Sequence, residues 1–246
     1  MMRVLILLAA LLFGQTYPAP GPGRNAYNAV TPITYTTHQC SVYGGATAIS
    51  TENCTLTVAN TGDTLLVFVS GSKGSAFNLN SATAGCGTGT VLRASLSFAG
   101  GTFYNSVASI PNATAGSCTV TITLSATALY LQEWVVDFAG ANTATPVDNA
   151  SCTSTPYCTA TGTAAAITSG SITTSNPNEM LVAWTSLGTT NTLSNRSGSP
   201  FTYVQFPANA GGGIAYGIET LAGSYTVPFT QSTTGYWGST VVALTH

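Results

Sequence analysis

The chain is short of charge. Only 5% of its 246 residues are Asp, Glu, Lys or Arg, whereas about a quarter is usual in a soluble protein. Five basic side chains against seven acidic ones give a formal net charge of −2. Nucleic acids and anionic membranes bind through clustered Lys and Arg, so this scarcity argues against both as partners. Solubility must come from hydroxyl and amide side chains.

Histidine is also scarce, since His38 and His246 are the only two in the sequence. A structural zinc site needs short paired Cys/His spacings, and the sequence has none. A Ser-His-Asp triad would have to use His38, beside a cysteine, or His246, the last residue. Clustered acids for calcium are missing, and the glycines at 211–213 lack the lysine and helix of a phosphate loop. We therefore expect no metal and no cofactor.

Long apolar runs are missing as well, because none beyond the N-terminus reaches 18 residues. In residues 1–14 an arginine precedes ten apolar residues, Val4 to Phe13. Ten residues rise about 15 Å as a helix, half of the hydrocarbon core, so the pattern predicts a secretory signal peptide instead of a membrane span. Residues 15–30, rich in Pro and Gly, are expected to form a flexible leader, and 31–246 a single domain. The expected location is secreted, extracellular or at the cell surface.

The cysteines fit such a destination. All six follow the signal, and an even number can pair completely in an oxidising compartment. Six cysteines allow fifteen pairings, among which sequence cannot choose rigorously. We favour sequential neighbours because each such pair brackets one hairpin or loop. The expected disulfides are Cys40 with Cys54, Cys86 with Cys118, and Cys152 with Cys158.

The rest of the chain has the pattern of short strands. Cys118–Leu124 alternates hydroxyl and apolar side chains, as in a half-buried antiparallel strand. Leu65–Val69 and Met180–Trp184 are continuously apolar, which predicts central strands covered on both sides. These features predict an all-β fold, an antiparallel two-sheet β-sandwich of jelly-roll type with disulfides. Further strands are expected at 32–43, 54–59, 63–70, 91–98, 128–138, 171–174, 179–187, 201–206, 213–221, 225–229 and 236–244.

One internal echo stands out between Asn60–Ser70 and Asn176–Ser186. Both segments place a turn and one carboxylate just before an apolar strand. Two explanations remain open at this point: equivalent strand entries in one sandwich, or duplication of a larger unit.

Three segments carry a family resemblance: the GDTLLVFVS strand from Gly62 to Ser70, the segment from Glu133 to Asp148, and the strand from Asn176 to Trp184. In these the chain resembles bacterial extracellular β-sandwich domains of surface and adhesin-like proteins. The resemblance implies a jelly-roll-like fold and an extracellular setting, and it carries over no active-site residues.

Catalysis would have to use the few acids. Glu133 and Asp137 lie on one face of a predicted strand, about 13 Å apart. Paired glycosidase carboxylates stand about 5 to 9.5 Å apart, so Glu133 would need a partner such as Glu179 or Glu219 from another strand. A secreted polysaccharide hydrolase or lyase is therefore the alternative function.

Aromatic side chains offer the better binding chemistry, since tyrosine combines an apolar ring with a polar tip. We expect the three tryptophans to pack in the core, because each lies inside a strand pattern. The predicted function is non-catalytic: adhesion, carbohydrate binding or self-assembly, with a glycan or further copies of the chain as partner. The candidate ligand-binding residues lie near loops or strand ends and are Tyr104, Tyr157, Tyr203 and Tyr236.

Overall fold

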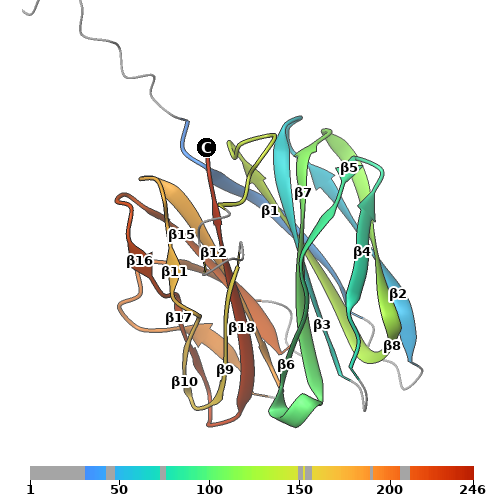
Figure 1. Cartoon of the computed structure of the whole chain (residues 1–246), viewed down its shortest axis with the longest axis vertical. Helices are drawn as coiled ribbons and strands as arrows, with labels where there is room; N and C mark the ends of the chain where they lie inside the picture. Colours follow the sequence, from blue (N-terminus) through green and yellow to red (C-terminus); the bar gives the residue numbers. More distant parts are fainter. Residues whose placement is uncertain are drawn as a thin grey trace, which may run out of the picture. The chain divides into compact units, whose positions relative to one another are not determined.

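The computed structural model describes residues 31–42, 48–72, 76–148, 152, 157–188, 191–205 and 211–246, without the side chains of 40–42. The predicted signal peptide and leader lie outside the described residues. Thr31–His246 form one compact unit. Its described elements are strands and one 3-10 turn, η1 (Ala99–Gly101), and every strand pair is antiparallel. The predicted all-β antiparallel sandwich is confirmed (Figure 1).

The first half of the unit is an eight-stranded sheet that folds back on itself through one long strand, β8. Residues 116–128 of β8 pair with β2 and β4, whereas residues 129–139 pair with β1 and β3. The sheet therefore forms an outer layer, β5-β4-β8-β2, and an inner layer, β6-β7-β3-β8-β1. Its strands are β1 (Thr34–Val42), β2 (Ile49–Val58), β3 (Asp63–Ser72), β4 (Leu79–Ala84), β5 (Gly87–Thr88), β6 (Thr90–Phe98), β7 (Phe103–Ala113) and β8 (Gly116–Ala139).

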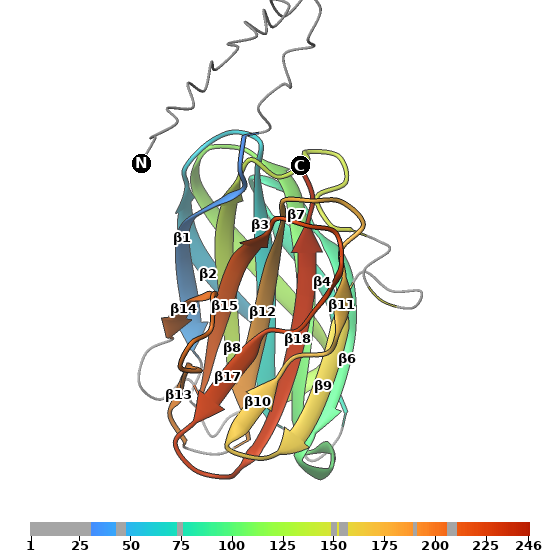
Figure 2. The same cartoon turned by 90° about the vertical axis from the view of Figure 1, so that its left-hand side faces the viewer.

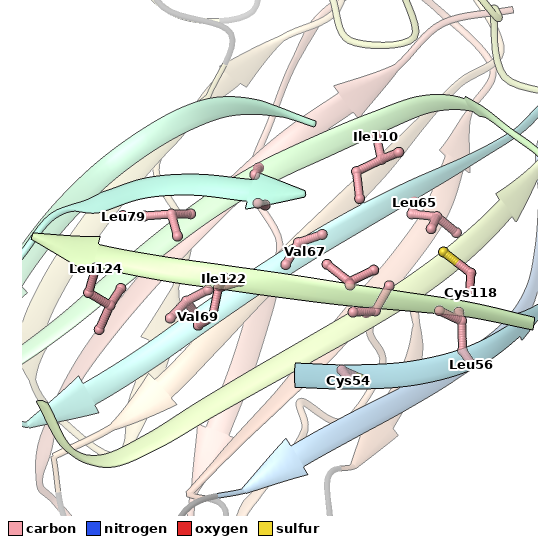
Figure 3. Packing of buried hydrophobic residues seen from close by; sticks show 14 of the residues in the cluster. Cys54, Leu56, Leu65, Val67, Val69, Leu79, Ile110, Cys118, Ile122 and Leu124 are labelled. Carbon is pink, nitrogen blue, oxygen red and sulfur yellow. The ribbon is translucent and has the colours of Figure 1, made fainter. Parts of the chain in front are cut away.

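An apolar cluster fills the space between these two layers. Val67 and Val69 of β3 meet Ile122 and Leu124 of β8 there, as Figure 3 shows. The period-two pattern of the first part of β8 explains this packing, because every second side chain points inward and is apolar. The first half is thus a sandwich in its own right.

The second half repeats this plan with shorter outer strands. Its inner sheet has the order β14-β15-β12-β18-β9, and a small outer sheet, β10-β17-β13, packs on it through a second apolar cluster (Figure 2). Strands β11 and β16 form a separate pair. The strands are β9 (Cys158–Thr163), β10 (Ala166–Thr168), β11 (Ile172–Thr173), β12 (Glu179–Leu187), β13 (Leu193–Asn195), β14 (Thr202–Gln205), β15 (Gly212–Glu219), β16 (Ser224–Tyr225), β17 (Pro228–Gln231) and β18 (Tyr236–Leu244).

The two halves share one strand order. The inner order β6-β7-β3-β8-β1 matches β14-β15-β12-β18-β9, and the outer order β4-β8-β2 matches β13-β17-β10. In this match β3 corresponds to β12, the two strands of the internal echo. The echo therefore marks equivalent positions in two copies of one topology, which favours the second of the two explanations, duplication of a larger unit.

The inner sheets pack against each other through these central strands. Phe68 stacks on Trp184 with ring centroids 5.3 Å apart, and the Ser70 hydroxyl lies 3.2 Å from that of Ser186. Both contacts join corresponding residues, and every residue of β3 and β12 is buried. This confirms the prediction that the two continuous apolar runs form strands covered on both sides. The predicted burial of the three tryptophans is also confirmed.

Two of the three expected disulfides are confirmed. Cys86 bonds Cys118 and Cys152 bonds Cys158, with Cα atoms 5.5 and 5.7 Å apart. The side chain of Cys40 lies outside the described residues, so its pairing with Cys54 stays a prediction. Within the described ranges, no helix has the length and apolar character needed to cross a membrane.

Candidate functional site

Tyr104 does not belong to a ligand site. Its side chain is 5% exposed, its ring lies 5.0 Å from that of Phe77, and its hydroxyl donates to the Gly101 carbonyl oxygen at 2.7 Å. The residue follows a glycine turn in sequence, which suggested a loop, but β7 begins one residue earlier and turns the ring into the core. We therefore correct its predicted binding role to a core role.

Tyr203 and Tyr157 are half-buried and lie in different places. The Tyr203 hydroxyl donates to the Leu193 carbonyl oxygen at 2.9 Å, and burial raises the pKa of that hydroxyl. The Tyr157 ring lies under the Arg93 guanidinium, 5.2 Å from ring centroid to Cζ. Tyr203 packs with the outer sheet of the second half, whereas Tyr157 packs against the cluster between the inner sheets. The four predicted tyrosines thus do not share one surface.

Tyr236 stands in a groove of about 340 Å³. It is 49% exposed and begins β18. The groove lies where the halves meet, because the end of β6 and the turn η1 supply one side and β9 the other. Ser97, Phe98, Gly100, Thr161 and Thr163 contribute to its lining.

Glycine makes the close approach at this groove possible. A Cβ at Gly238 would lie 2.6 Å from the Phe98 ring, and one at Gly162 would lie 2.7 Å from the Trp237 ring. Gly100 adopts φ of 68°, a left-handed conformation that glycine takes without strain. The contact of Gly238 with Phe98 holds β6 of the first half against β18 of the second, and the contact of Gly162 with Trp237 packs the neighbouring strands β9 and β18.

The groove is uncharged. Its lining, all within the described residues, contains no Asp, Glu, Lys, Arg or His. Hydroxyl groups, glycine backbone and the Tyr236 ring are what it offers a ligand. A second groove, of about 410 Å³ along β4 and β5, is also uncharged but has no aromatic side chain in its lining.

Glu133, the best catalytic candidate in the sequence, is inaccessible. It is fully buried, and neither carboxylate oxygen hydrogen-bonds to any described residue. Burial, reinforced by the nearby charge of Glu52, raises its pKa to about 9, so it is neutral at pH 7. Glu179 and Glu219 lie opposite each other on the second inner sheet and do not partner it. An acid without access to solvent cannot protonate a glycosidic bond.

Asp63 and Asp137 hold the loop before β3. The Asn60 N–H donates to Asp63 at 2.9 Å, and the Ala59 N–H donates to Asp137 at 3.1 Å. Burial raises the pKa of Asp137 to about 6 in spite of the Ala59 hydrogen bond, and the charge of Asp63 adds to the rise. Both carboxylates thus accept hydrogen bonds from backbone N–H groups of this loop.

An equivalent acid pair holds the loop before β12. The Asn176 N–H donates to Glu179 at 3.1 Å, and the Ser175 N–H donates to Asp148 at 2.9 Å. Burial is the main cause that raises the pKa of Glu179. Ser175, Asn176 and Glu179 match Ala59, Asn60 and Asp63 residue for residue. Asp148, from the loop before β12, binds this loop as Asp137 of β8 binds the first one, so both acid pairs have a structural role. No described group of three or more His, Cys, Asp or Glu side chains is placed to hold a metal ion.

Comparisons with protein-family models, with curated proteins and with solved structures found no match. Only the geometry of the structure therefore identifies the Tyr236 groove as a candidate site. Sequence reasoning selected Tyr236 but missed the rest of the groove, because its walls come from segments at least 60 residues apart. The paired glycines of η1 were the one local signal of a tight turn there.

Proposed function

We propose that this chain is a secreted or cell-surface, non-catalytic protein that binds a neutral carbohydrate in the groove beside Tyr236. One observation carries the proposal: a half-exposed tyrosine ring stands in a groove that has hydroxyl and backbone groups but no charge. A sugar ring offers apolar C–H faces to an aromatic ring and hydroxyl groups to polar neighbours. An uncharged groove suits a neutral sugar and excludes strongly ionic ligands.

The setting is consistent with such a role. The two disulfides are compatible with an oxidising compartment, and the N-terminal pattern predicts export. The resemblance to extracellular surface and adhesin-like domains supports a binding role in adhesion. The burial of Glu133 weighs against the alternative of a polysaccharide hydrolase or lyase that uses this acid.

The test is binding of neutral glycans to the secreted protein, first on a glycan array and then by isothermal titration with the best oligosaccharide. Stacking on and covering one face of a tyrosine is worth about 2 kcal/mol. We therefore expect Tyr236→Ala to weaken binding at this site roughly 30-fold.

Leu221→Ala is the matched control, because Leu221 is a large apolar side chain, 70% exposed, outside the groove lining. It should bind like the parent protein. The proposal is wrong if no neutral glycan binds, or if Tyr236→Ala binds as tightly as the control.

A further inference from the structure

The shared topology assigns each residue of β18 a counterpart in the second part of β8. Phe68 of β3 lies opposite Trp134 of β8, and Trp184 of β12 lies opposite Thr240 of β18. Since Phe68 and Trp184 correspond, Trp134 and Thr240 also correspond. Four residues back along each strand are positions 130 and 236. The pairing of β8 with β3 shifts by one residue there, since Ser70 lies opposite Gln132 and Ser72 opposite Leu129, so Tyr130 is the extra residue of a β-bulge beside the position that matches Tyr236.

Both positions are tyrosine, and both side chains are exposed. Tyr130 is 55% exposed and Tyr236 is 49% exposed, and each is followed directly by a large buried side chain, Leu131 or Trp237. The echo between the halves thus extends from the central strands to the one residue of β18 that faces the proposed glycan groove.

The two tyrosines lie at the same end of the unit. The contacts of Phe68 with Trp184 and of Ser70 with Ser186 advance together along β3 and β12, so these two strands run in the same direction. The second part of β8 is antiparallel to β3, and β18 is antiparallel to β12. Both strands therefore start where β3 and β12 finish, with their tyrosines within one residue of equivalent positions on the two inner sheets.

The backbone of Tyr130 adopts an unusual conformation at this bulge. Tyr130 has φ of 50°, in the left-handed region, which is unfavourable for a bulky residue and free of strain for glycine. It lies at the point where β8 changes partners from β2 to β3. A bend alone would be served better by glycine, whereas an aromatic contact requires the ring.

We propose that Tyr130 marks a second carbohydrate contact and that the chain is bivalent, with one glycan contact in each half. The inference rests on the proposed function of Tyr236 and extends it from binding to bridging. Two linked sites on one polysaccharide surface raise the overall avidity by about 10²- to 10⁴-fold without any new contact. Two sites on different chains cross-link them, which is the chemistry of an adhesive or matrix protein.

The experiment uses beads coated with dextran, mannan or galactan, together with the secreted protein, whose monomeric state is checked by light scattering. The parent protein should both bind and agglutinate the beads that carry its preferred polysaccharide. Tyr130→Ala and Tyr236→Ala should each still bind single beads but lose agglutination, and the double variant should lose both. Leu221→Ala should agglutinate like the parent.

A second variant, Tyr130→Gly, removes the ring and relieves the backbone, so it guards against a folding defect in Tyr130→Ala. It should fail to agglutinate although it folds at least as well as the parent by circular dichroism. Bivalency is refuted if Tyr130→Gly agglutinates like the parent, or if Tyr236→Ala alone abolishes all binding. If the parent protein binds no bead, the proposed function is wrong as well. Binding by the parent protein therefore separates failure of bivalency from failure of the proposed function.

Discussion

Replacing Glu133 by Gln should stabilise the protein at neutral pH. The carboxyl is buried in the sandwich of the first half, and its pKa is about 9 in the folded chain against 4.5 when unperturbed. Folding at pH 7 therefore requires uptake of a proton. Over the 2.5 pH units between 4.5 and 7, at about 1.4 kcal/mol per unit, this uptake costs about 3 kcal/mol. Glutamine has nearly the same shape and needs no proton.

The sign follows from the raised pKa. The stability linked to Glu133 is fully present below pH 4.5, falls as pH rises, and is lost once pH passes about 9. We expect Glu133→Gln to be about 3 kcal/mol more stable than the parent at pH 7 and nearly equal to it at pH 4. Urea unfolding followed by circular dichroism at pH 4, 5.5, 7 and 8.5 measures the difference.

A matched variant separates the two causes of the shift. Burial is the larger cause of the raised pKa of Glu133, and the charge of Glu52 is the smaller one. Glu52→Gln should therefore lower the pKa of Glu133 and give only part of the stability that Glu133→Gln gains. Equal pH slopes in the parent and in Glu133→Gln would refute the argument, because they would mean that Glu133 is hydrated or already paired in the folded state.

Two further predictions concern packing within the second half and a disulfide bond. Gly162→Ala should destabilise the fold by about 1–3 kcal/mol, because its Cβ would lie 2.7 Å from the Trp237 ring, whereas Gly85→Ala, with nothing within 4 Å, should change little; urea unfolding compares them. Replacing Cys86 and Cys118 together by Ser should cost about 4 kcal/mol, because the bond closes 32 residues of chain. A loss below about 1 kcal/mol in thermal unfolding would contradict the second estimate.

The strongly apolar strands were predictable from sequence. β12 and β18 begin and end where the pattern placed them, and β3 runs two residues further than expected. Their residues are buried on both faces or along one whole face, so composition alone identifies them. The predicted strands 118–124 and 128–138 are one continuous strand, since β8 bends at Tyr130 without leaving the sheet.

β7 was missed because its polar residues resemble a loop. Asn105 and Ser106 are buried, and the Asn105 amide donates to the Gly238 carbonyl oxygen at 2.9 Å. The Ser186 hydroxyl donates to Asn105 Oδ1 at 2.6 Å. These partners lie 133 and 81 residues away, so the hydrogen bonds that make such a polar strand stable exist only once the halves have met. The walls of the Tyr236 groove escaped prediction for the same reason.

The two ends of the unit carry different kinds of residue, and each kind occurs in both halves. Asp63 and Glu179 clamp their loops at the end where β3 and β12 begin, each with a second buried acid beside it. Tyr130 and Tyr236 lie at the opposite end, where the same strands finish. The acids are buried and accept hydrogen bonds from loop N–H groups, whereas the tyrosines are exposed to solvent. The repeated topology therefore places the buried acid pairs at one end of the unit and, at the other, the two exposed tyrosines that we propose as glycan contacts.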